Sequence, residues 1–506
     1  MTDLHLFDSP LHIAQQLRCI AHTQTQLCQD SRLLKTGDIF VAFSGDIHDG
    51  RHHIATALKS GVCAVLAEAE GLEAFLTPDV VSNQMIKMIQ IIAVNNLKQA
   101  LGGIADAFYN HPSQVLDVVA ITGTNGKTTV VNYLAQLLEQ LQQKPCVVLG
   151  TLGAGLYGKA LSTGLTTPHA SQVHTVLAQA IKAGAGSAAI EATSIGLQEG
   201  RLNSVAIDVA ALTNFTQDHL DYHGTMAAYA AAKRSLFDWV SLKTAVINID
   251  DALGVDLVSS LQTERPTLRL ITTGLTPTAD LYTSDITILA NGMQSFILHY
   301  QQQQYVITIP LLGIFNISNI LTVLACLVAL SYDLALVINL LPHLKGTPGR
   351  MEVVKIADLQ IPLVLVDYAH TPDGLLKALQ ALQPVAHRRN GKLHLIFGCG
   401  GNRDASKRPL MGTIAHQYSD TVCITNDNPR DEDPETIAVD IATGIPDILI
   451  ELDRSKAIKQ IITQANINDV ILIAGKGHET TQIIKGHSFI FSDVSCAEQI
   501  LSTLNN

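Results

Sequence analysis

The sequence predicts an α/β protein built from several parallel-sheet domains. At 506 residues the chain is too long for one hydrophobic core, and its length suggests about three domains. Strand-length apolar runs alternate with helical patterns, which is typical of parallel sheets with helices on both faces. A glycine-rich segment, residues 123–129, stands between an apolar run and a helical pattern, where phosphate-binding loops lie.

Residues 1–112 form the first predicted domain. The apolar runs at 37–43 and 63–69 indicate two strands, and the Ala-rich stretch at 52–60 between them indicates a helix. The segment YNHPS at 109–113 has the composition of a joint between domains.

The second predicted domain, residues 113–345, opens with the glycine-rich segment. The backbone N–H groups of such a loop and the N-terminus of the following helix bind anions. Lys127 would then neutralise the outer phosphates of a nucleotide, and the Thr128 hydroxyl would ligate Mg²⁺. Ile121 stands where the usual loop has its first glycine, so the loop is shortened. The alternative is an ordinary glycine turn that begins a helix.

The third predicted domain, residues 346–506, begins at a Gly/Pro turn. Four apolar runs in it each end in a burst of polar and glycine residues. Ligands bind at the carboxyl ends of the strands in open parallel sheets, so these segments should form one site that faces the nucleotide domain. The segments are DYAHTPD at 367–373, GCGGNRD at 398–404, NDNPRDED at 426–433 and GKGHE at 475–479.

Composition and charge exclude several classes of protein. With a net charge of −12 and no Lys/Arg-rich run, the chain lacks the basic face that nucleic-acid binding needs. Its eight Cys are scattered without a C-x-x-C pair, which is typical of a reducing compartment rather than of disulfides or a zinc site. The N-terminus has no signal-peptide pattern, and the longest apolar run, Ile320–Leu330, is too short to span a bilayer. We therefore expect a soluble, cytoplasmic protein.

The central domain offers candidate ligands for a cation. Glu191 follows the apolar run GSAAI, where a carboxylate for Mg²⁺ would lie, and the segment 213–237 adds His219, His223 and Lys233. The spacing of the two histidines also resembles half of a zinc site, which would need a third ligand and usually a helix beneath the pair. Zinc is disfavoured, because three residues argue against a helix there: Asp218, Asp221 and Gly224.

Eight motifs, in order and over nearly the whole chain, resemble those of the Mur ligase family. They are TGTNGKTT, TNFTQDHLDYHGTMAAYAAAKRSLF, GIFNISN, GTPGRME, VDYAHTPD, FGCGGNRD, DNPR and GKGHE. The shortened loop is this family's form, and the chain looks most like the members that add the third residue of the peptidoglycan stem peptide. The resemblance implies three domains: one that binds a UDP-linked substrate, a central P-loop ATPase-like parallel sheet, and a C-terminal Rossmann-like domain that binds an amino acid.

The resemblance also implies the reaction. ATP would phosphorylate the γ-carboxylate of D-glutamate in UDP-N-acetylmuramoyl-L-alanyl-D-glutamate, and an amine would attack the acyl phosphate. The implied cofactors are Mg²⁺ and CO₂, the latter as a carbamate on Lys233 that would bind the cation instead of repelling it. The plainer alternatives are a solvated lysine at Lys233 and a backbone-bonded loop histidine at His219. We expect a monomer that acts in cytoplasmic peptidoglycan precursor synthesis.

The family's functional positions carry over onto this chain as three groups. The catalytic and metal-binding residues are Lys127, Thr128, Glu191, His219 and carbamoylated Lys233. The ATP contacts are Gly123, Thr124, Asn125, Gly126, Lys127, Thr128, Thr129, Asn316, Arg350, Asp367 and His370, with a helix cap as the alternative role of Asn316. The contacts to the UDP-linked dipeptide are Gln29, Ser31, Asp46, Ile47, His48, Thr166, Thr167, Thr193, Glu199 and Arg201.

The incoming amino acid is expected to be meso-diaminopimelate, because DNPR is the form seen in diaminopimelate-adding family members. This amino acid carries an extra carboxylate beside its distal amine, and a planar guanidinium such as that of Arg430 binds a carboxylate bidentately. The alternatives are L-lysine, or more remotely a folylpolyglutamate-synthase-like ligase, and a surface ion pair for Arg430. The residues implied for diaminopimelate are Arg403, Asp427, Asn428, Pro429, Arg430, Gly475 and Glu479.

Three positions depart from the family's pattern. Leu165 stands where an Asn is familiar, Ile195 where a His is, and Glu199 where a Gln is. A carboxylate beside an anionic substrate is unfavourable, so these departures leave the fine geometry of substrate binding open.

Overall fold

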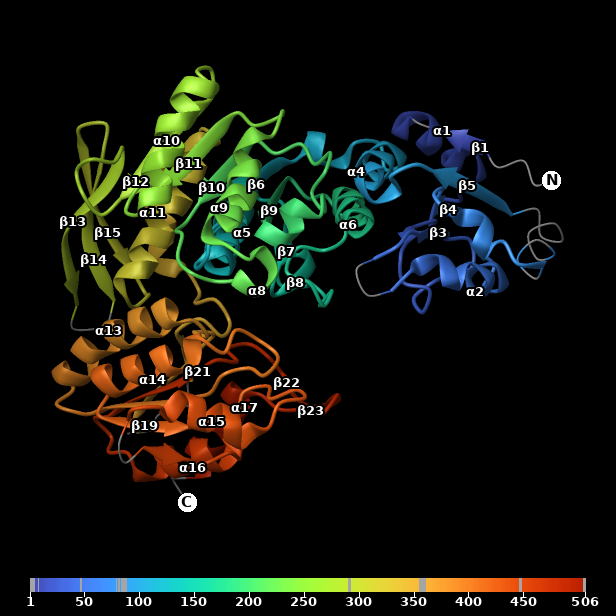
Figure 1. The fold of residues 1–506 in the computed structure, drawn as a ribbon. Helices are drawn as coiled ribbons and strands as arrows, with labels where there is room; N and C mark the ends of the chain where they lie inside the picture. The colour runs from blue at the N-terminus through green and yellow to red at the C-terminus, as the bar shows by residue number, and fades with distance from the viewer. Residues whose placement is uncertain are drawn as a thin grey trace.

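The computed structural model of the protein describes residues 5–7, 9–45, 48–78, 80, 82, 89–289, 293–354, 361–445 and 448–503. Three large sheets follow one another along this part of the chain, each covered by helices, so the α/β fold class predicted from the sequence is confirmed (Figure 1). None of the helices described is long and apolar enough to cross a bilayer.

The first unit is a five-stranded sheet in the order β1-β5-β4-β3-β2, with every neighbouring pair parallel. Its strands are β1 (His5–Phe7), β2 (Leu27–Cys28), β3 (Ile39–Ala42), β4 (Ala64–Glu68) and β5 (Gln90–Val94). Its helices are α1 (Pro10–Ile20), η1 (Gly50–His53), α2 (Ile54–Lys59), η2 (Leu72–Phe75) and α4 (Leu97–Phe108). The two predicted strands and the helix between them are confirmed as β3, β4 and α2.

The second unit is a ten-stranded sheet in the order β15-β14-β13-β12-β11-β10-β6-β9-β7-β8. Its strands are β6 (Asp117–Thr122), β7 (Cys146–Gly150), β8 (Gly153–Leu156), β9 (Ser187–Glu191), β10 (Val209–Leu212), β11 (Thr244–Asn248), β12 (Arg269–Gly274), β13 (Leu281–Ile288), β14 (Gln294–Tyr300) and β15 (Gln303–Ile309). Because β6 lies between β9 and β10, the loop that follows it opens near the middle of the sheet.

Helices cover both faces of this second sheet. Its helices are η3 (Pro112–Val115), α5 (Lys127–Gln142), α6 (Ala170–Lys182), α7 (Ser194–Gln198), α8 (Leu220–His223), α9 (Met226–Arg234), η4 (Ser235–Asp238), α10 (Ala252–Glu264), α11 (Ile314–Ala329), α12 (Leu334–Leu340) and η5 (Leu341–His343). One buried apolar cluster joins α5 and α11 to the sheet, and another joins α6 and α10 to its opposite face. The predicted helix after the glycine loop is therefore confirmed.

The prediction of a parallel sheet is wrong at both edges of this unit. β8 pairs antiparallel with β7, and β13, β14 and β15 form an antiparallel meander. Two features make the meander: a tight turn at Gln301 and Gln302, which both have positive φ, and the alternating burial of β14. The strand-length segments rich in apolar and aromatic residues on either side of the glutamines, 296–300 and 305–309, were the signal for it in the sequence.

The third unit is a six-stranded sheet in the order β16-β17-β21-β18-β19-β20. Its strands are β16 (Glu352–Val353), β17 (Leu363–Asp367), β18 (Leu393–Phe397), β19 (Thr421–Ile424), β20 (Leu449–Ile450) and β21 (Val470–Ala474), and a separate hairpin follows, β22 (Thr481–Ile484) and β23 (His487–Ile490). Its helices are α13 (Pro372–Arg388), α14 (Lys407–Tyr418), α15 (Pro434–Ala442), α16 (Arg454–Gln464) and α17 (Asp493–Thr503). β17, β21, β18 and β19 are adjacent and parallel, so the four predicted polar segments do emerge at one edge.

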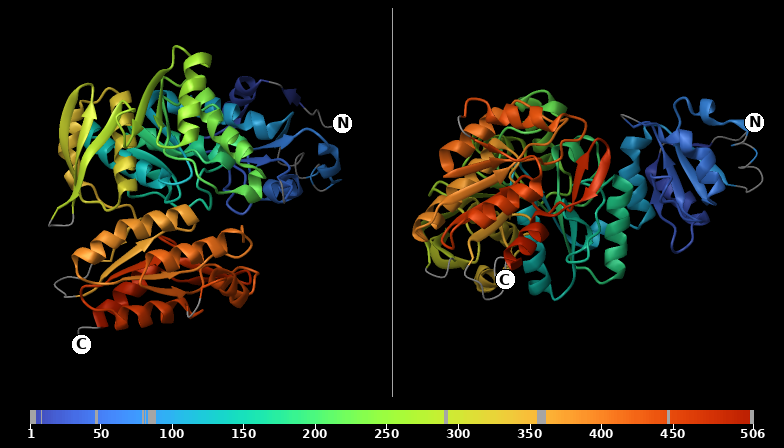
Figure 2. Two further views of the ribbon diagram at one scale, coloured as in Figure 1. Left: turned by 60° about the vertical axis from the view of Figure 1, so that its left-hand side comes forward. Right: turned by 90° about the horizontal axis from the view of Figure 1, so that it is seen from below.

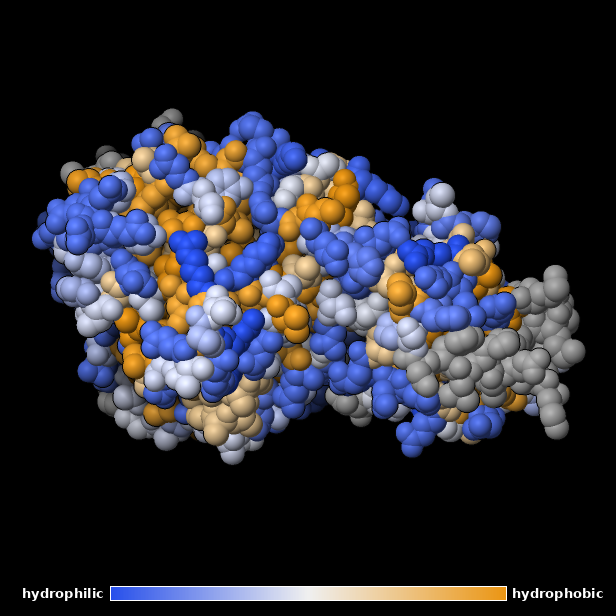
Figure 3. All heavy atoms as spheres, turned by 90° about the horizontal axis from the view of Figure 1, so that it is seen from above, coloured by the Kyte–Doolittle hydropathy of each residue, from blue (hydrophilic) through white to orange (hydrophobic). Residues whose placement is uncertain are grey.

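The three units form an elongated arrangement. Figures 1 and 2 show the first unit at one end, next to the central unit at α4 and α6, and the third unit packed beneath the central one, with the β22–β23 hairpin projecting from its side. In the space-filling view the first unit is a lobe beside a larger body, with hydrophilic and hydrophobic side chains interspersed on both (Figure 3).

A buried ion pair ties the third unit together. The Arg454 guanidinium donates two hydrogen bonds of 2.7 Å to Asp493, and it also donates to Ala474 O and Asn426 O at the ends of β21 and β19. Both side chains are fully buried, so removing one leaves an uncompensated charge.

We expect Asp493→Ala to lower the free energy of unfolding by about 3–5 kcal/mol, because the Arg454 charge would remain buried without its partner. Urea unfolding measures the change. A matched control is Glu264→Ala, which breaks an exposed pair with Arg234 and should cost about 0–1 kcal/mol. Equal losses in the two variants would contradict the role given to the buried pair.

Candidate active site

The glycine loop between β6 and α5 is closely packed against its neighbours. Gly123 and Gly126 have φ of +142° and +88°. A Cβ atom on Gly123 would lie 2.0 Å from Thr213 Oγ1, and one on Gly126 would lie 2.4 Å from Asn319 Oδ1. The positive φ and the close neighbours both favour glycine at these two positions, as in the tight loops whose backbone N–H groups bind anions.

Two lysines of the site share one acceptor. Lys127 Nζ donates to Gly123 O at 2.7 Å and to Thr124 O at 2.8 Å, so the side chain folds back over its own loop. Lys233 Nζ donates to the same Gly123 O at 2.7 Å and lies 4.3 Å above the Tyr229 ring. Lys233 is 1% exposed, so the alternative of a solvated lysine is wrong. Burial lowers the pKa of both lysines, and the Lys127 charge further lowers the pKa of Lys233.

Glu191, the last residue of β9, is buried directly beside the loop helix. Its Oε2 accepts hydrogen bonds from Thr128 Oγ1 at 3.0 Å and Thr151 Oγ1 at 3.2 Å, and its Oε1 accepts one from Thr151 N–H at 2.8 Å. Mg²⁺ prefers hard oxygen ligands and needs only one or two carboxylates beside substrate phosphates. The Thr128 hydroxyl and the Glu191 carboxylate therefore fit such an ion.

Among the described residues, His219 shares no hydrogen bond or ion pair with Thr128 or Glu191. It precedes α8 with φ of 53°, and its Nε2 is 3.6 Å from Asp218 Oδ2. Burial lowers the pKa of His219, while the Asp218 charge raises it. In the described ranges no group of three or more His, Cys, Asp or Glu side chains could hold a metal ion, so Glu191 and His219 do not form a ready-made cluster.

The prediction against a helix at 220–223 is wrong, because α8 makes one turn there. Asp221 lies in that first turn, where a negative charge is favourable, and Gly224 ends the turn with φ of +72°. The His223 ring is hydrogen-bonded to Ser194 Oγ at 2.9 Å, so it belongs to the contact between α8 and α7.

One cavity lies between the glycine loop, the start of α11 and the third unit. Asn316 stands in the first turn of α11, and its Nδ2 donates to Leu312 O at 2.7 Å. The cap position is occupied by Gly313, so the alternative of a helix cap for Asn316 is wrong. The predicted ATP contacts on the wall of this cavity are Asn125, Gly126, Thr129, Asn316, Arg350, Asp367 and His370.

The third unit supplies a preorganised wall to this cavity. The Arg350 guanidinium stacks 4.4 Å above the Tyr368 ring, and its Nε is a buried donor without an acceptor within the described residues. Asp367 accepts hydrogen bonds from Met351 N–H and Ala369 N–H at 2.7 Å each. A buried guanidinium donor left open beside the loop is suited to a phosphate oxygen.

His370 lies where this cavity meets a second one. Burial lowers its pKa to about 4, and the Lys407 charge adds to the effect, so the ring is neutral at physiological pH. Its Nδ1 is 2.9 Å from Tyr368 O, to which a neutral ring donates, and this leaves Nε2 as an acceptor.

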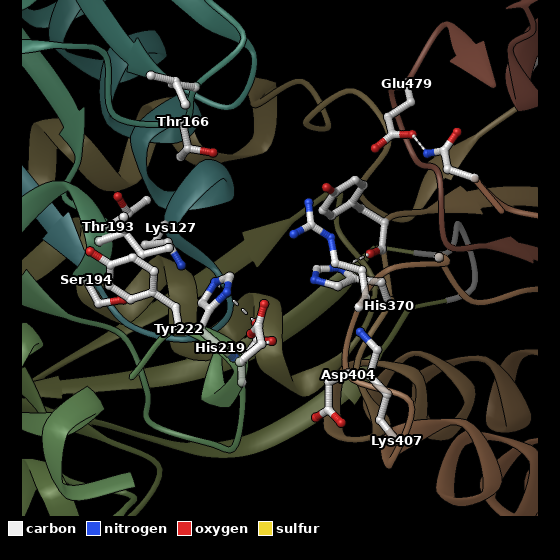
Figure 4. A pocket seen from close by; sticks show the side chains of 18 of the residues that line it. Lys127, Thr166, Thr193, Ser194, His219, Tyr222, His370, Asp404, Lys407 and Glu479 are labelled. Carbon is white, nitrogen blue, oxygen red and sulfur yellow. Dashed lines mark hydrogen bonds and ion pairs between the residues drawn. The ribbon is translucent and has the colours of Figure 1, made fainter. Parts of the chain in front are cut away.

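The second cavity, which we call the cleft, separates the central unit from the third unit (Figure 4). The predicted site residues on its central wall are Lys127, Thr166, Thr167, Thr193, Arg201, His219 and Lys233. Those on the facing wall are His370, Arg403, Asp427, Asn428, Arg430, Gly475 and Glu479. Pro429 is not among the lining residues.

Hydrogen bonds fix the hydroxyls of the central wall. Thr167 Oγ1 lies 2.7 Å from Glu191 O and 2.8 Å from Thr193 Oγ1, and Thr193 caps α7. Arg201 donates to Thr167 O at 2.8 Å, and its guanidinium pairs with Glu199 at 2.6 Å. The departure at Glu199 is thus balanced by a neighbouring cation, while the departures at Leu165 and Ile195 add apolar surface to the wall.

On the facing wall, Arg430 is held by backbone rather than by acidic neighbours. Its Nη1 donates to Gly401 O at 2.9 Å, and its φ is 52°. The adjacent Glu432 pairs with Arg408, and Asp433 caps α15. The alternative of a surface ion pair for Arg430 therefore finds no support in these contacts.

A polar network lies beside Arg430. Asn428 Nδ2 and the buried Lys476 Nζ both donate to Glu479 Oε2, at 2.8 and 3.0 Å. Lys476 is also 3.7 Å from Asp427 Oδ1, which has no hydrogen-bond partner in the described part of the chain. Burial raises the pKa of Asp427, and the Lys476 charge lowers it. The wall thus offers the guanidinium of Arg430 and the carboxylates of Asp427 and Glu479 to a ligand that carries both negative and positive groups.

Three family models match successive parts of the chain: the Mur ligase family catalytic domain at residues 25–109, the Mur ligase middle domain at 121–327, and the Mur ligase glutamate ligase domain at 349–477. A protein of Acidovorax sp. strain JS42, named UDP-N-acetylmuramoyl-L-alanyl-D-glutamate--2,6-diaminopimelate ligase, is 44% identical over 94% of this chain and 93% of its own length. The chain belongs to the Mur ligase family.

Other relatives agree with this assignment. A protein of the same name from Pseudomonas putida KT2440 is 42% identical over 94% of this chain and 95% of its own. A solved structure of a protein with the same ligase name is 36% identical in sequence. The match covers 97% of this chain and 99% of the other, with a TM-score of 0.64.

Gln29, Ser31 and His48, substrate positions predicted in the first unit of this Mur ligase, are not among the lining residues of either cavity. Gln29 Oε1 accepts a hydrogen bond of 2.8 Å from Ser171 Oγ on α6, at the contact with the central unit. Ser31 is half-buried in a turn, and His48 is exposed. Asp46 and Ile47 lie outside the described residues.

Several cleft residues were missed by the sequence analysis. Asp404 and Lys407 follow β18 just as Arg403 does, so the rule that polar groups gather at strand ends could have found them. Ser194 and Tyr222 carried no such signal, because short helices bring them to the wall (Figure 4).

Proposed function

We propose that this Mur ligase adds meso-2,6-diaminopimelate to UDP-N-acetylmuramoyl-L-alanyl-D-glutamate at the expense of ATP, in cytoplasmic peptidoglycan precursor synthesis. One observation carries the proposal: a phosphate loop and Arg201 on one wall of a cleft face Arg430 and Glu479 on the other. An acid to be activated and an amino acid to be joined to it would meet between these walls. One chain supplies both walls, which supports a monomer as the active form.

Each unit has a proposed role, with boundaries near the two joints of the chain. Residues 1–112 would bind the UDP part of the substrate, with Gln29, Ser31, Asp46, Ile47 and His48 as contacts. Residues 113–345 would bind the muramoyl dipeptide and most of ATP, and Arg350, Asp367 and His370 of the third unit would complete the ATP site. Residues 346–506 would bind diaminopimelate. Because the reactants are held by different units, we expect these units to close over them.

The chemistry follows from the groups that line the cleft. ATP transfers its terminal phosphoryl group to the γ-carboxylate of D-glutamate, and the amine of diaminopimelate then displaces phosphate from the acyl phosphate. Lys127, with the loop N–H groups and Arg350, binds the phosphate oxygens on which negative charge collects. To do so Lys127 must leave the carbonyl oxygens of Gly123 and Thr124.

Mg²⁺ is the cation proposed for the site. When bound, it neutralises negative charge on the transferring phosphate. Thr128 and Glu191 would hold it, and His219 and a carbamate on Lys233 complete the proposed ligand set. The carbamate forms when the neutral Nζ amine adds CO₂ and releases one proton. Burial favours that neutral amine, because it lowers the pKa of Lys233.

The choice of amino acid tests the proposal. With the UDP-linked dipeptide present, we expect meso-diaminopimelate to drive phosphate release and L-lysine to drive far less. Arg430→Ala should lower kcat/KM for diaminopimelate by on the order of 10²-fold, because hydrogen bonds to a charged group contribute about 1.5–3 kcal/mol each. Activity with L-lysine should hardly change.

Arg389→Ala is a matched control, since it removes a guanidinium of the same unit that, within the described residues, donates to the backbone carbonyls of Asn468 and Ile467 and lies outside the cavity lining. It should change kcat/KM by less than about threefold. A preference of the wild type for L-lysine, or a loss of less than about threefold in Arg430→Ala, would show that the amino acid has been assigned wrongly.

A further inference from the structure

The backbone of Arg430 is held by the β22–β23 hairpin. Arg430 N–H donates to Ile483 O at 3.0 Å, and Lys485 N–H donates back to Arg430 O at 2.6 Å. Arg430 and Ile484 form a parallel bridge outside the main sheets. β22 therefore lies beside the DNPR segment as an added strand.

Two further hydrogen bonds extend this contact along the segment. Asn428 Oδ1 accepts from Ile483 N–H at 2.9 Å. Gln482 Nε2 donates to Asp427 O at 2.8 Å. Three residues of the segment line the cleft, Asp427, Asn428 and Arg430, and each of them is hydrogen-bonded to β22.

The hairpin restrains a conformation that the segment would not keep by itself. A non-glycine residue at positive φ is unfavourable, and Arg430 has φ of 52°. This turn of the backbone accompanies the contact between the guanidinium and Gly401 O, which holds the side chain at the cleft wall. Without β22 the backbone would be free to relax, and the guanidinium would lose its fixed direction.

The outer strand of the hairpin, β23, is poorly supported. All four residues of β23 are exposed, and a lone two-stranded hairpin is only marginally stable. Its turn has positive φ at both Lys485 and Gly486, 47° and 74°, as a type I′ turn requires. A change at this turn should therefore alter the population of the ordered hairpin.

We propose that the β22–β23 hairpin is a positioning element for the distal carboxylate of diaminopimelate, acting through the backbone of residues 427–430. The inference rests on the proposed function. It predicts that the hairpin controls KM for diaminopimelate and leaves the ATP and dipeptide sites unchanged, because those sites are built by other elements.

Gly486→Ala tests the hairpin from outside the cleft. A Cβ on Gly486 would meet no atom within 4 Å, so the variant only strains the turn. We expect KM for meso-diaminopimelate to rise about tenfold, the scale set by a left-handed L-residue, while kcat and the KM values for ATP and the UDP-linked dipeptide stay within about twofold. Gln482→Leu, which removes one hydrogen bond and keeps the turn, should raise the same KM by about fivefold.

Gly444→Ala is the matched control. Gly444 also has positive φ, 78°, lies in the same unit, and has no atom within 4 Å of an added Cβ, but it follows α15. Its KM for diaminopimelate should stay within about twofold of wild type.

Three outcomes decide the inference. A rise of KM for diaminopimelate alone, in both hairpin variants, supports it. A KM within about twofold of wild type in both, or a parallel rise for all three substrates, overturns it. If the wild type does not use diaminopimelate, the proposed function fails first, before any variant is compared.

Discussion

The Lys127→Ala variant is expected to lose at least about 10³-fold of the ligation rate, the scale on which one cation stabilises a transferring phosphoryl group. Lys127 is the first residue of α5, and its ammonium lies on the carbonyl oxygens of Gly123 and Thr124. Neither oxygen belongs to a charged group, and Lys127 has no ion-pair partner among the residues that the structure describes. A phosphate would offer it a stronger, charge-assisted acceptor.

Two measurements separate this role from a structural one. Thermal unfolding should show a folded variant, and nucleotide binding should weaken while the dipeptide still binds. Lys182→Ala, which removes an exposed lysine at the end of α6, serves as the control and should leave turnover within about twofold. Wild-type turnover in Lys127→Ala with intact ATP binding would show that the loop does not act on phosphate.

The features that the sequence predicted are those set by local pattern. The order apolar run, glycine loop, helix fixes β6 and α5, and the packing of Gly123 and Gly126 leaves no room for another residue. The four polar segments of the third unit came together for a similar reason, because neighbouring parallel strands must end at the same edge.

The features that escaped prediction depend on contacts between distant segments. Nothing near Lys233 in the sequence shows that its Nζ reaches Gly123 O, 110 residues away. The ion pair between Glu199 and Arg201 is local in the sequence. The sequence does not show, however, that the same guanidinium also donates to Thr167 O and so lies at the cleft wall. The hairpin beside Arg430 follows it by more than fifty residues, so its role could be seen only in the fold.

The shared acceptor of Lys127 and Lys233 bears on how the site is prepared for ATP. Two ammonium groups on Gly123 O would repel each other, and burial already disfavours both charges. Conversion of Lys233 to a carbamate would place a negative charge beside Lys127 and remove the possibility of a second ammonium there. The remaining charge on Lys127 would then be favoured, which is the form that phosphate binding needs.

We therefore expect Lys233→Ala to lower kcat by on the order of 10²- to 10³-fold, because the Mg²⁺ that stabilises charge on the transferring phosphate would lose one of its proposed ligands. Formate or acetate should restore activity by at least about tenfold, equivalent to 1.4 kcal/mol, because a small carboxylate can enter the space left by the side chain. The same salts should not rescue Lys127→Ala, whose missing group is a cation. With ¹³C-labelled CO₂, wild-type protein should give a carbamate signal that Lys233→Ala lacks. Absence of that signal, or equal stimulation of both variants by acetate, would mean that Lys233 acts as a plain amine that only braces the loop at Gly123 O.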